Sequence, residues 1–314
     1  MRRILMYGAV AALGLGIAFV FLSPTPTKAP KIAASAPVVT PAPLPERVAP
    51  RPIPRRPVLT TPVNCAEPQS LAGASADNAA SLTGREWSPW GRAERGWEIY
   101  LPLVAREIGS ACDAGSPGFA QALSQWQSSH TLNATGVLTP ATFEVMRVAW
   151  LKQRPFVTAF AKGQCPPAAD ERSLEPARKD EGYSGKPVSL TPAALAAYRE
   201  MVEAARREVP DLAADRRLLT IFSAYRAPVA DEARCDMEQS CGSITRARCS
   251  AHRTGTAVDL FVGAAPGSRP ESSDDANRLF QSRSPAYRWL VANAERFGFV
   301  AYPFEPWHWE WTGG

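Results

Sequence analysis

Apolar residues recur with helical spacing across residues 87–157, the first stretch of the chain with a folded pattern. Phe119, Leu123 and Trp126 stand at i, i+4 and i+7, which places them on one face of a helix. The Thr-Pro pair at residues 139–140 opens another helix, because threonine caps helix N-termini and proline suits the first helical position. We therefore expect a compact bundle of short helices.

The second half of the chain mixes helical and strand patterns. Thr191-Pro192 opens a helix that runs to about Val209, and residues 286–297 predict a helix ended by Gly298. Strands are expected at residues 218–225, 256–262, 299–304 and 307–312. Helices and strands are interspersed without regular alternation, which favours an α+β fold.

The N-terminus carries an apolar run. Residues 4–22 contain no charge and would span about 28 Å as a helix, close to the hydrocarbon thickness of a bilayer. Arg2 and Arg3 favour leaving the short leading end in the cytoplasm. A retained membrane anchor is our first interpretation and a cleaved signal peptide is the alternative. Either way, the rest of the chain is expected outside the cytoplasm, in the periplasmic part of the cell envelope.

Proline marks the first linker. Residues 24–62 contain twelve prolines and cannot bury enough apolar surface to fold. A second segment rich in proline and charge begins at about Gln164. The predicted organisation is an anchor or signal segment at 1–23, a linker at 24–63, a helical domain at 64–163, a linker at 164–187 and a catalytic domain at 188–314.

The distribution of charge argues against a nucleic-acid partner. The net charge of the chain is +5, but residues 1–63 alone carry a net +7, so the remaining residues carry −2. The basic excess therefore lies in a tail and not on a folded face.

The six cysteines suit an oxidising compartment. They stand at Cys65, Cys112, Cys165, Cys235, Cys241 and Cys249, three in each half of the chain. Odd counts imply either a disulfide between the halves or a free thiol in each, and the pairing stays open. The spacing of the last three is poor for a cysteine zinc site.

The chain has only 3 histidines, and two of them lie beside carboxylates in the last third. His252 is followed by Asp259, and His308 stands between Glu305 and Glu310. A catalytic zinc ion takes three protein ligands and keeps one position open for water. His252, Asp259 and His308 would supply that set for one Zn²⁺ ion.

The last expected strand adds a geometric argument. Trp307, Trp309 and Trp311 alternate, so they would share the core face while His308 shares the other face with Glu310. A regular strand would turn Glu305 away from His308, but the adjacent Pro306 makes a departure from regular pairing plausible. From the residues alone, Glu305 and Glu310 are both candidate general bases.

The two clusters read S-x-H-x-x-G-x-A-x-D and E-x-W-H, and together they resemble the zinc D,D-peptidases, the family of the VanX dipeptidase and the VanY carboxypeptidase. The resemblance covers about residues 190–312. It implies a catalytic domain with an antiparallel sheet and flanking helices. It also implies zinc ligands His252, Asp259 and His308, with Glu305 as the general base.

Ser223-Ala224-Tyr225-Arg226 is similar to the S-x-Y-R element of the same family, whose arginine faces the substrate. We expect Arg226 to act in catalysis and substrate binding, with Ser250 and Tyr225 beside the substrate. Two features depart from the family: the cysteines between Arg226 and Ser250, which suggest a disulfide-bonded flap over the cleft, and the absence, in the residues that follow Arg226, of the glutamine usually found there in the family.

Residues 119–146 resemble the peptidoglycan-binding-like domain, through Trp126-Gln127, His130 and the Thr135-Gly136 turn among others. Because most of these are core or cap residues, the resemblance implies a small all-α fold first. Contact with cell-wall glycan through residues 87–157 is a secondary expectation.

The sequence thus predicts a zinc carboxypeptidase that cuts D-Ala-D-Ala in peptidoglycan stem peptides, tethered by residues 4–22. An endopeptidase that cuts D,D cross-links or the L-Ala–D-Glu bond is the close alternative. A D,D-dipeptidase suits a tethered chain less well. A non-catalytic wall-binding protein is the alternative from another class.

Overall fold

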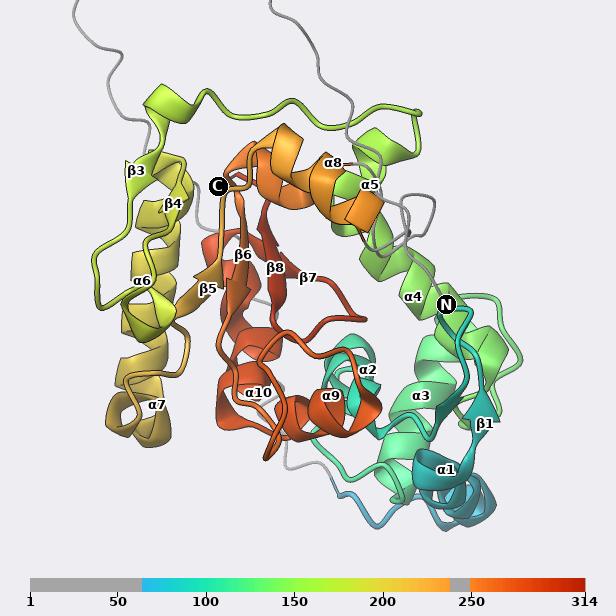
Figure 1. Cartoon of the computed structure of the whole chain (residues 1–314). Helices are drawn as coiled ribbons and strands as arrows, with labels where there is room; N and C mark the ends of the chain where they lie inside the picture. Colours follow the sequence, from blue (N-terminus) through green and yellow to red (C-terminus); the bar gives the residue numbers. More distant parts are fainter. Residues whose placement is uncertain (1–63, 238–248, 314) are drawn as a thin grey trace, which may run out of the picture. The chain divides into compact units, whose positions relative to one another are not determined.

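The computed structural model describes residues 64–237 and 249–313 (Figure 1). The expected membrane segment at residues 4–22 and the proline-rich linker lie outside the described residues, as do residues 238–248 of the expected flap, Cys241 among them. Among the residues that are described, no helix is both long and apolar enough to span a bilayer.

The N-terminal part is mostly helical, as expected. Its α-helices are α1 (Ala72–Gly84), α2 (Leu101–Ile108), α3 (Pro117–Ser129), α4 (Pro140–Gln153) and α5 (Pro155–Phe160). The Thr139 side chain caps α4 by accepting a hydrogen bond from the amide of Thr142 at 3.1 Å. Helix α1 and the two-residue strands β1 (Glu86–Trp87) and β2 (Glu94–Arg95) were not expected from the sequence.

The C-terminal part confirms the α+β class. Its helices are α6 (Pro192–Glu208), α7 (Pro210–Ala214), α8 (Pro228–Met237), α9 (Asp275–Ser282) and α10 (Pro285–Asn293). Its main strands are β5 (Ile221–Ser223), β6 (Ala257–Leu260), β7 (Phe299–Ala301) and β8 (His308–Trp311). Each falls inside an expected strand but is shorter. A 3₁₀ turn follows α10 and ends at Gly298 with φ of 78°.

The four main strands form one antiparallel sheet in the order β5-β6-β8-β7. Strand β6 lies between β5 and β8, and its Asp259 pairs directly with His308 of β8. Residues that face each other across neighbouring strands point their side chains to the same face of a sheet. The register therefore brings an acidic side chain and an imidazole together, although 49 residues separate them.

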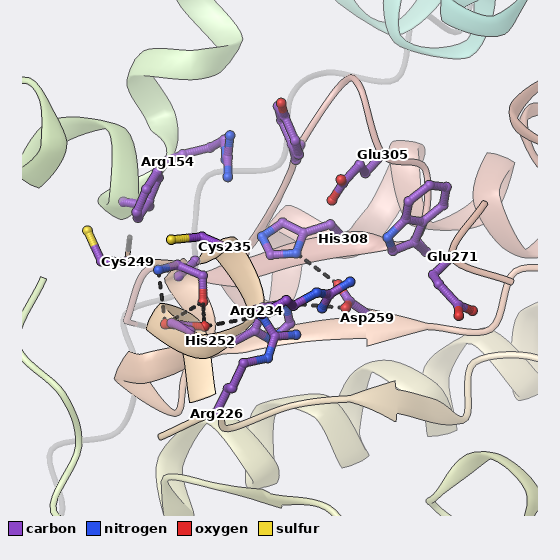
Figure 2. A pocket seen from close by; sticks show the side chains of 16 residues that line it. Arg154, Arg226, Arg234, Cys235, Cys249, His252, Asp259, Glu271, Glu305 and His308 are labelled. Atoms are coloured by element: carbon purple, nitrogen blue, oxygen red, sulfur yellow. Dashed lines mark hydrogen bonds and ion pairs between the residues drawn. The ribbon is translucent and has the colours of Figure 1, made fainter. Parts of the chain in front are cut away.

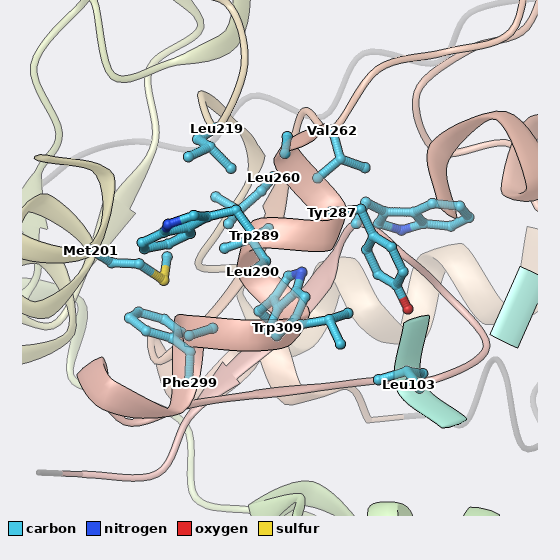
Figure 3. Close-up of a cluster of buried hydrophobic side chains, with 14 of the residues drawn as sticks. Leu103, Met201, Leu219, Leu260, Val262, Tyr287, Trp289, Leu290, Phe299 and Trp309 are labelled. Carbon is cyan, nitrogen blue, oxygen red and sulfur yellow. The ribbon is translucent and has the colours of Figure 1, made fainter. Parts of the chain in front are cut away.

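The two faces of this sheet have different surroundings. Leu260 and Trp309 lie in a hydrophobic cluster with Tyr287 and Leu290 of α10 and with Met201 of α6 (Figure 3). Successive strand residues point to opposite faces, so the neighbouring polar residues of β6 and β8 point away from this cluster. The alternation predicted for the last strand is confirmed at Trp309, which is 2% exposed.

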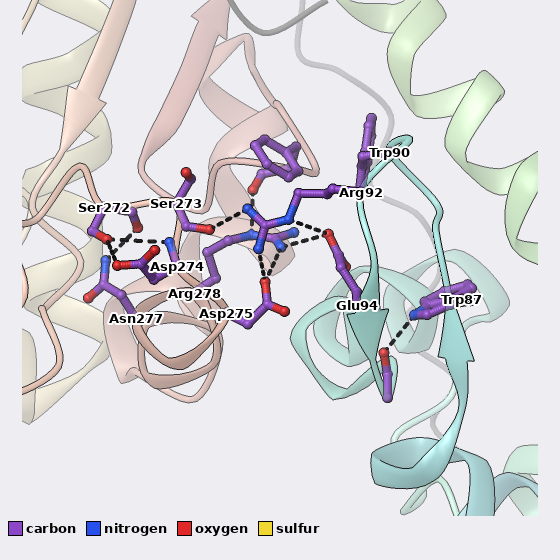
Figure 4. A network of polar contacts seen from close by, with 12 residues as sticks. Trp87, Trp90, Arg92, Glu94, Ser272, Ser273, Asp274, Asp275, Asn277 and Arg278 are labelled. Atoms are coloured by element: carbon purple, nitrogen blue, oxygen red, sulfur yellow. Dashed lines mark hydrogen bonds and ion pairs between the residues drawn. The ribbon is translucent and has the colours of Figure 1, made fainter.

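The core continues from the C-terminal part into the N-terminal helices. Leu103 of α2 belongs to the same hydrophobic cluster as Trp309 (Figure 3). A polar contact also joins the two parts, because the buried Arg278 of α9 pairs with Glu94 of β2 at 2.9 Å (Figure 4). Arg278 also donates a hydrogen bond to the Tyr100 hydroxyl at 2.6 Å. The helical region therefore packs against the sheet domain through both apolar and charged contacts.

The segment expected as a second linker contacts the C-terminal part closely. Strand β3 (Glu175–Pro176) pairs with β4 (Ser189–Leu190). The Ala169 amide donates a hydrogen bond to the Arg253 carbonyl at 2.8 Å. A disulfide joins Cys165 to Cys249 next to the predicted site.

The disulfides confirm one of the two alternatives drawn from the cysteine count. Cys65 bonds Cys112 within the first half, and Cys165 bonds Cys249 across the two halves. Cys235 is disulfide-bonded as well, and none of the described cysteines is free.

Candidate metal centre

Three side chains predicted as ligands lie together at the polar face of the sheet (Figure 2). His252 lies in a 3₁₀ turn, Asp259 in β6 and His308 at the first position of β8. One ligand atom from each lies within 4.8 Å of the others, and all three residues are buried. The structure thus brings together the set that the sequence predicted.

Local geometry explains how residues of one motif converge. The turn that carries His252 ends at Gly255, whose φ of +68° lies in the left-handed region. This left-handed conformation favours glycine, and a Cβ there would also come within 2.9 Å of the end of the Leu174 side chain. The chain then enters β6 directly and delivers Asp259 beside His252.

Hydrogen bonds decide which atoms face the centre. His252 places Nδ1 2.8 Å from the Ala224 carbonyl oxygen, so its Nε2 is left to face Asp259 Oδ2 at 3.3 Å. His308 points Nδ1 at Asp259 Oδ1, 2.9 Å away. Its Nε2 faces Glu310 at 3.4 Å.

This donor set fits a single zinc ion. Ligands at about 2.0–2.1 Å from a tetrahedral zinc lie about 3.4 Å from one another. Nε2 of His252 lies 3.3 Å from Oδ2 of Asp259, and Nδ1 of His308 lies 2.9 Å from Oδ1, so the groups are close enough to share one ion. Two imidazoles and one carboxylate are a common catalytic zinc set, and each imidazole also has an oxygen acceptor for its second nitrogen, as ligating histidines usually do.

The charges of the three groups support one another. Burial alone would raise the pKa of Asp259, but the two histidines outweigh it and hold that pKa far below its usual range. Burial alone would lower the pKa of His308, but Asp259 and Glu310 raise it to about 9. The site is therefore an environment that favours positive charge.

Glu305 lies in the turn between β7 and β8 and borders the same pocket as the three predicted ligands (Figure 2). Its amide donates to the Tyr302 carbonyl at 3.0 Å and its own carbonyl accepts from the His308 amide at 2.9 Å. The expected departure from a regular strand near Pro306 is thus present. Burial raises the pKa of Glu305, an effect that suits a group exchanging protons.

Glu310, the other candidate base, has its oxygens engaged elsewhere. Arg154 donates from Nε to Glu310 Oε1 at 2.7 Å, and the Phe156 amide donates to Oε2 at 3.1 Å. Burial would raise the pKa of Glu310, but Arg154 and His308 lower it to about 2. Its carboxylate does not border the pocket, so Glu305 is better placed as a base.

Arg226 borders the pocket and is held in place from two sides. Its guanidinium pairs with Asp231 at 3.2 Å and donates to the Ser223 hydroxyl at 3.2 Å. Ser250 donates to the same Asp231 from its hydroxyl at 2.9 Å and from its amide at 3.1 Å. The buried carboxylate of Asp231 thus links Arg226 to Ser250, two residues that were predicted to lie beside the substrate.

Tyr225 lies apart from the three ligands. Its hydroxyl donates to Glu171 at 3.0 Å, and its side chain borders a neighbouring cavity of about 630 Å³. The pocket that contains the histidines has a volume of about 120 Å³. Arg226, Asp259 and Glu271 border both, so the two hollows adjoin.

Sequence reasoning did not identify Asp231 or Arg154. Asp231 stands in the first turn of α8, five residues after Arg226, a position with no distinctive pattern. Arg154 lies 156 residues from Glu310 in the chain. No local signal could have pointed to either contact.

A buried centre with two imidazoles, one carboxylate and a nearby glutamate is the kind of site that mononuclear metallohydrolases use. Residues 187–314 match the family model VanY, D-alanyl-D-alanine carboxypeptidase, so this part of the chain is similar to that family. The VanY family is typically metal-dependent, and its cell-wall peptidases act outside the cytoplasm. No curated protein and no solved structure matches the chain.

The match begins at residue 187 and does not confirm the resemblance of residues 119–146 to a peptidoglycan-binding-like domain. His130, in that stretch, stacks on Trp126 with ring centroids 3.8 Å apart. Its Nδ1 lies 2.8 Å from the Trp126 carbonyl oxygen. This histidine therefore has a local role at the end of α3, remote in sequence from the predicted ligands.

Proposed function

We propose that this protein is a zinc-dependent D,D-carboxypeptidase that removes the terminal D-alanine from peptidoglycan stem peptides. The observation that carries the proposal is the convergence of His252, Asp259 and His308 within 4.8 Å, in a domain that matches D-alanyl-D-alanine carboxypeptidases. Zinc is the ion that this donor set favours among common catalytic metals.

When bound, zinc would supply a water of lowered pKa, near 7, and would polarise the scissile carbonyl. His252, Asp259 and His308 would hold it. Glu305 borders the same pocket and would take the proton of the attacking water and return it to the leaving amine. Burial raises the pKa of Glu305 toward neutral pH. A carboxyl group with a pKa nearer the working pH can both accept and donate a proton more efficiently.

Arg226 would recognise the substrate. Its planar guanidinium suits a carboxylate, and the terminal carboxylate of the stem peptide is the group that distinguishes a carboxypeptidase substrate. Stabilisation of the developing oxyanion is the other role open to it. In both roles, Asp231 would hold the guanidinium in position, and Ser250, bound to the same aspartate, would line the pocket beside Arg226.

An endopeptidase is the alternative, and one feature favours it. The cavity of about 630 Å³ next to the ligand pocket offers room for peptide on both sides of a scissile bond. The two activities differ in their products. A carboxypeptidase releases free D-alanine from pentapeptide stems, whereas an endopeptidase releases muropeptides from cross-linked wall. A non-catalytic wall-binding protein would bind zinc and release neither.

Mass spectrometry of peptidoglycan digested with the purified protein tests the proposal. We expect stems shortened by one D-alanine, and no shortening when a chelator is present. Solubilised muropeptides without free D-alanine would replace the carboxypeptidase with an endopeptidase. Unchanged peptidoglycan in the presence of bound zinc would favour the wall-binding protein.

Two further parts of the proposal rest on the sequence. The apolar residues 4–22 would tether the catalytic domain to the cytoplasmic membrane, with residues 24–63 as an extended spacer. Residues 87–157 would contact cell-wall glycan. Fractionation of cells that express the full chain tests the first, and pull-down of residues 64–314 with purified glycan strands tests the second.

A further inference from the structure

Arg154 comes from the N-terminal helical region, outside the VanY-like domain, yet it borders the pocket of the predicted metal centre (Figure 2). It directly precedes α5, and its side chain is only 8% exposed. Two of its nitrogens, Nε and Nη2, lie 2.7 and 2.6 Å from Glu310 Oε1. The helical region therefore reaches into the site with a buried guanidinium that is paired with Glu310.

The backbone of the same region binds the other oxygen of Glu310. The amide of Phe156, two residues after Arg154, donates to Oε2 at 3.1 Å. Glu310 is 1% exposed, and a buried carboxylate is costly unless it is paired and hydrogen-bonded. Arg154 and Phe156, which donate these hydrogen bonds to Glu310, both precede residues 187–314, the region that matches the VanY family.

Glu310 connects this pair to a predicted ligand. Its Oε1 lies 3.4 Å from Nε2 of His308, whose other nitrogen faces Asp259 at 2.9 Å. Carboxylates in this position fix the ring orientation and the tautomer of a metal-binding histidine. A continuous series of contacts thus runs from Asp259 through His308 and Glu310 to Arg154.

The Arg154 guanidinium is also fixed by the ring beneath it. It lies 3.9 Å from the centroid of Tyr302, and the Tyr302 amide donates to the His308 carbonyl at 3.0 Å. A planar group that stacks on a ring while it binds a carboxylate cannot be replaced by lysine without loss. The contact requires arginine in particular and not only a positive charge.

We propose that Arg154 is a positioning residue that, through Glu310, fixes the orientation of His308, so that the N-terminal helical region completes the metal centre of the VanY-like domain. The inference rests on the proposed function in that it takes His308 as a metal ligand. It assigns the helical region a part in the active site, in addition to any contact with the cell wall.

Zinc affinity, measured by competition with a chromophoric chelator, is the first test. We compare the full-length protein with its Arg154→Met and Arg154→Lys variants. Loss of an outer partner of a metal ligand typically costs about 10- to 100-fold in affinity, and we expect a loss in this range for Met and a smaller loss for Lys. Wild-type affinity in both variants would overturn the proposal.

Arg199→Met is the matched control. Arg199 of α6 also pairs with a buried carboxylate, that of Glu181, at 2.8 Å, and it does not border the pocket. We expect its zinc affinity to stay within about twofold of wild type, because ligand orientation is unchanged. If both arginine variants lose affinity equally, general destabilisation explains the result and Arg154 has no positioning role.

A double-mutant cycle tests the path through Glu310. In a Glu310→Gln background, Arg154→Met should reduce zinc affinity by much less than it does in wild type. An undiminished loss would contradict the path. If Arg154→Met does not fold, Arg154→Lys in the two backgrounds provides the same comparison.

Kinetics with excess zinc separate the inference from the proposed function. We expect Arg154→Lys to lower kcat for release of D-alanine with little change in KM, because a misaligned ligand impairs the reaction and not substrate binding. Wild-type protein that binds zinc but cleaves no stem peptide would end the proposed function, while the affinity comparison would still decide the role of Arg154. Wild-type protein without zinc affinity would overturn both.

Discussion

Asp259 and His308 occupy paired positions on neighbouring antiparallel strands, and Oδ1 of the aspartate lies 2.9 Å from Nδ1 of the imidazole. Strand register places the two residues side by side, with the rest of both strands anchored in the core by residues such as Leu260 and Trp309. The proximity of two predicted ligands is therefore set by the sheet.

Replacement of Glu305 by glutamine should abolish activity while zinc binding persists. Glu305 is not one of the three clustered ligands, and loss of a general base typically costs about 10²–10⁴-fold in kcat. Elemental analysis and D-alanine release measure the two effects. Glu203→Gln, an exposed change on α6, is the control. Near-normal turnover in Glu305→Gln would assign the base to Glu310 or another residue.

Replacement of His308 by alanine should remove the metal. A site with two remaining ligands is too weak to retain zinc through dialysis, because catalytic zinc takes three protein ligands. His130→Ala is a matched control, since that ring stacks on Trp126 outside the cluster and should leave zinc at wild-type content. Equal zinc in the His308→Ala and wild-type proteins would refute the ligand role.

Arg226→Ala should lower kcat/KM for a pentapeptide stem by about 10- to 150-fold, the equivalent of about 1.5–3 kcal/mol for a hydrogen bond to a charged group. A rise in KM would assign Arg226 to the terminal carboxylate, and an amidated stem peptide would then be insensitive to the substitution. A fall in kcat would assign it to the oxyanion. Arg217→Ala, at an exposed pair with Asp215, is the control. Unchanged kinetics would exclude both roles.

Glu181 should contribute stability that is lost in acid. Burial alone would raise its pKa, but hydrogen bonds from Arg199 and Arg178 outweigh this and lower it below the usual value. A folded-state pKa below the unfolded one stabilises the protein above the unfolded pKa of about 4.5, and this contribution disappears as pH falls through the folded value. Glu181→Gln should therefore lower Tm at pH 7 and matter less at pH 3. A Tm deficit that is the same at both pH values would contradict this.

The clustering of His252, Asp259 and His308 could be predicted because the pattern around each residue is local. The alternation around His308 fixes its face, Gly255 marks the turn after His252, and Asp259 follows on the next strand. Short-range patterns such as these can be recognised from residues that lie close together in the sequence. The residues of the helical region that pack against the sheet carry no comparable pattern.

From the residues alone, the choice between Glu305 and Glu310 stayed open, and only the resemblance implied Glu305. What distinguishes the two glutamates in the structure is Arg154, which engages Glu310 from the junction between α4 and α5, 156 residues earlier in the chain. The same limit applies to Asp231, which joins Arg226 to Ser250 only after α8 has packed. The disulfide between Cys165 and Cys249 was one of many pairings that the sequence allowed. Contacts between distant segments are set by packing, and a single sequence does not reveal them.

X-ray diffraction at the zinc absorption edge, on crystals of residues 64–314 grown with zinc, tests the metal centre most directly. We predict one anomalous peak about 2.0–2.2 Å from Nε2 of His252, a carboxylate oxygen of Asp259 and Nδ1 of His308. A peak bound by other residues, or no peak at this site in protein that retains activity, would contradict the proposed centre.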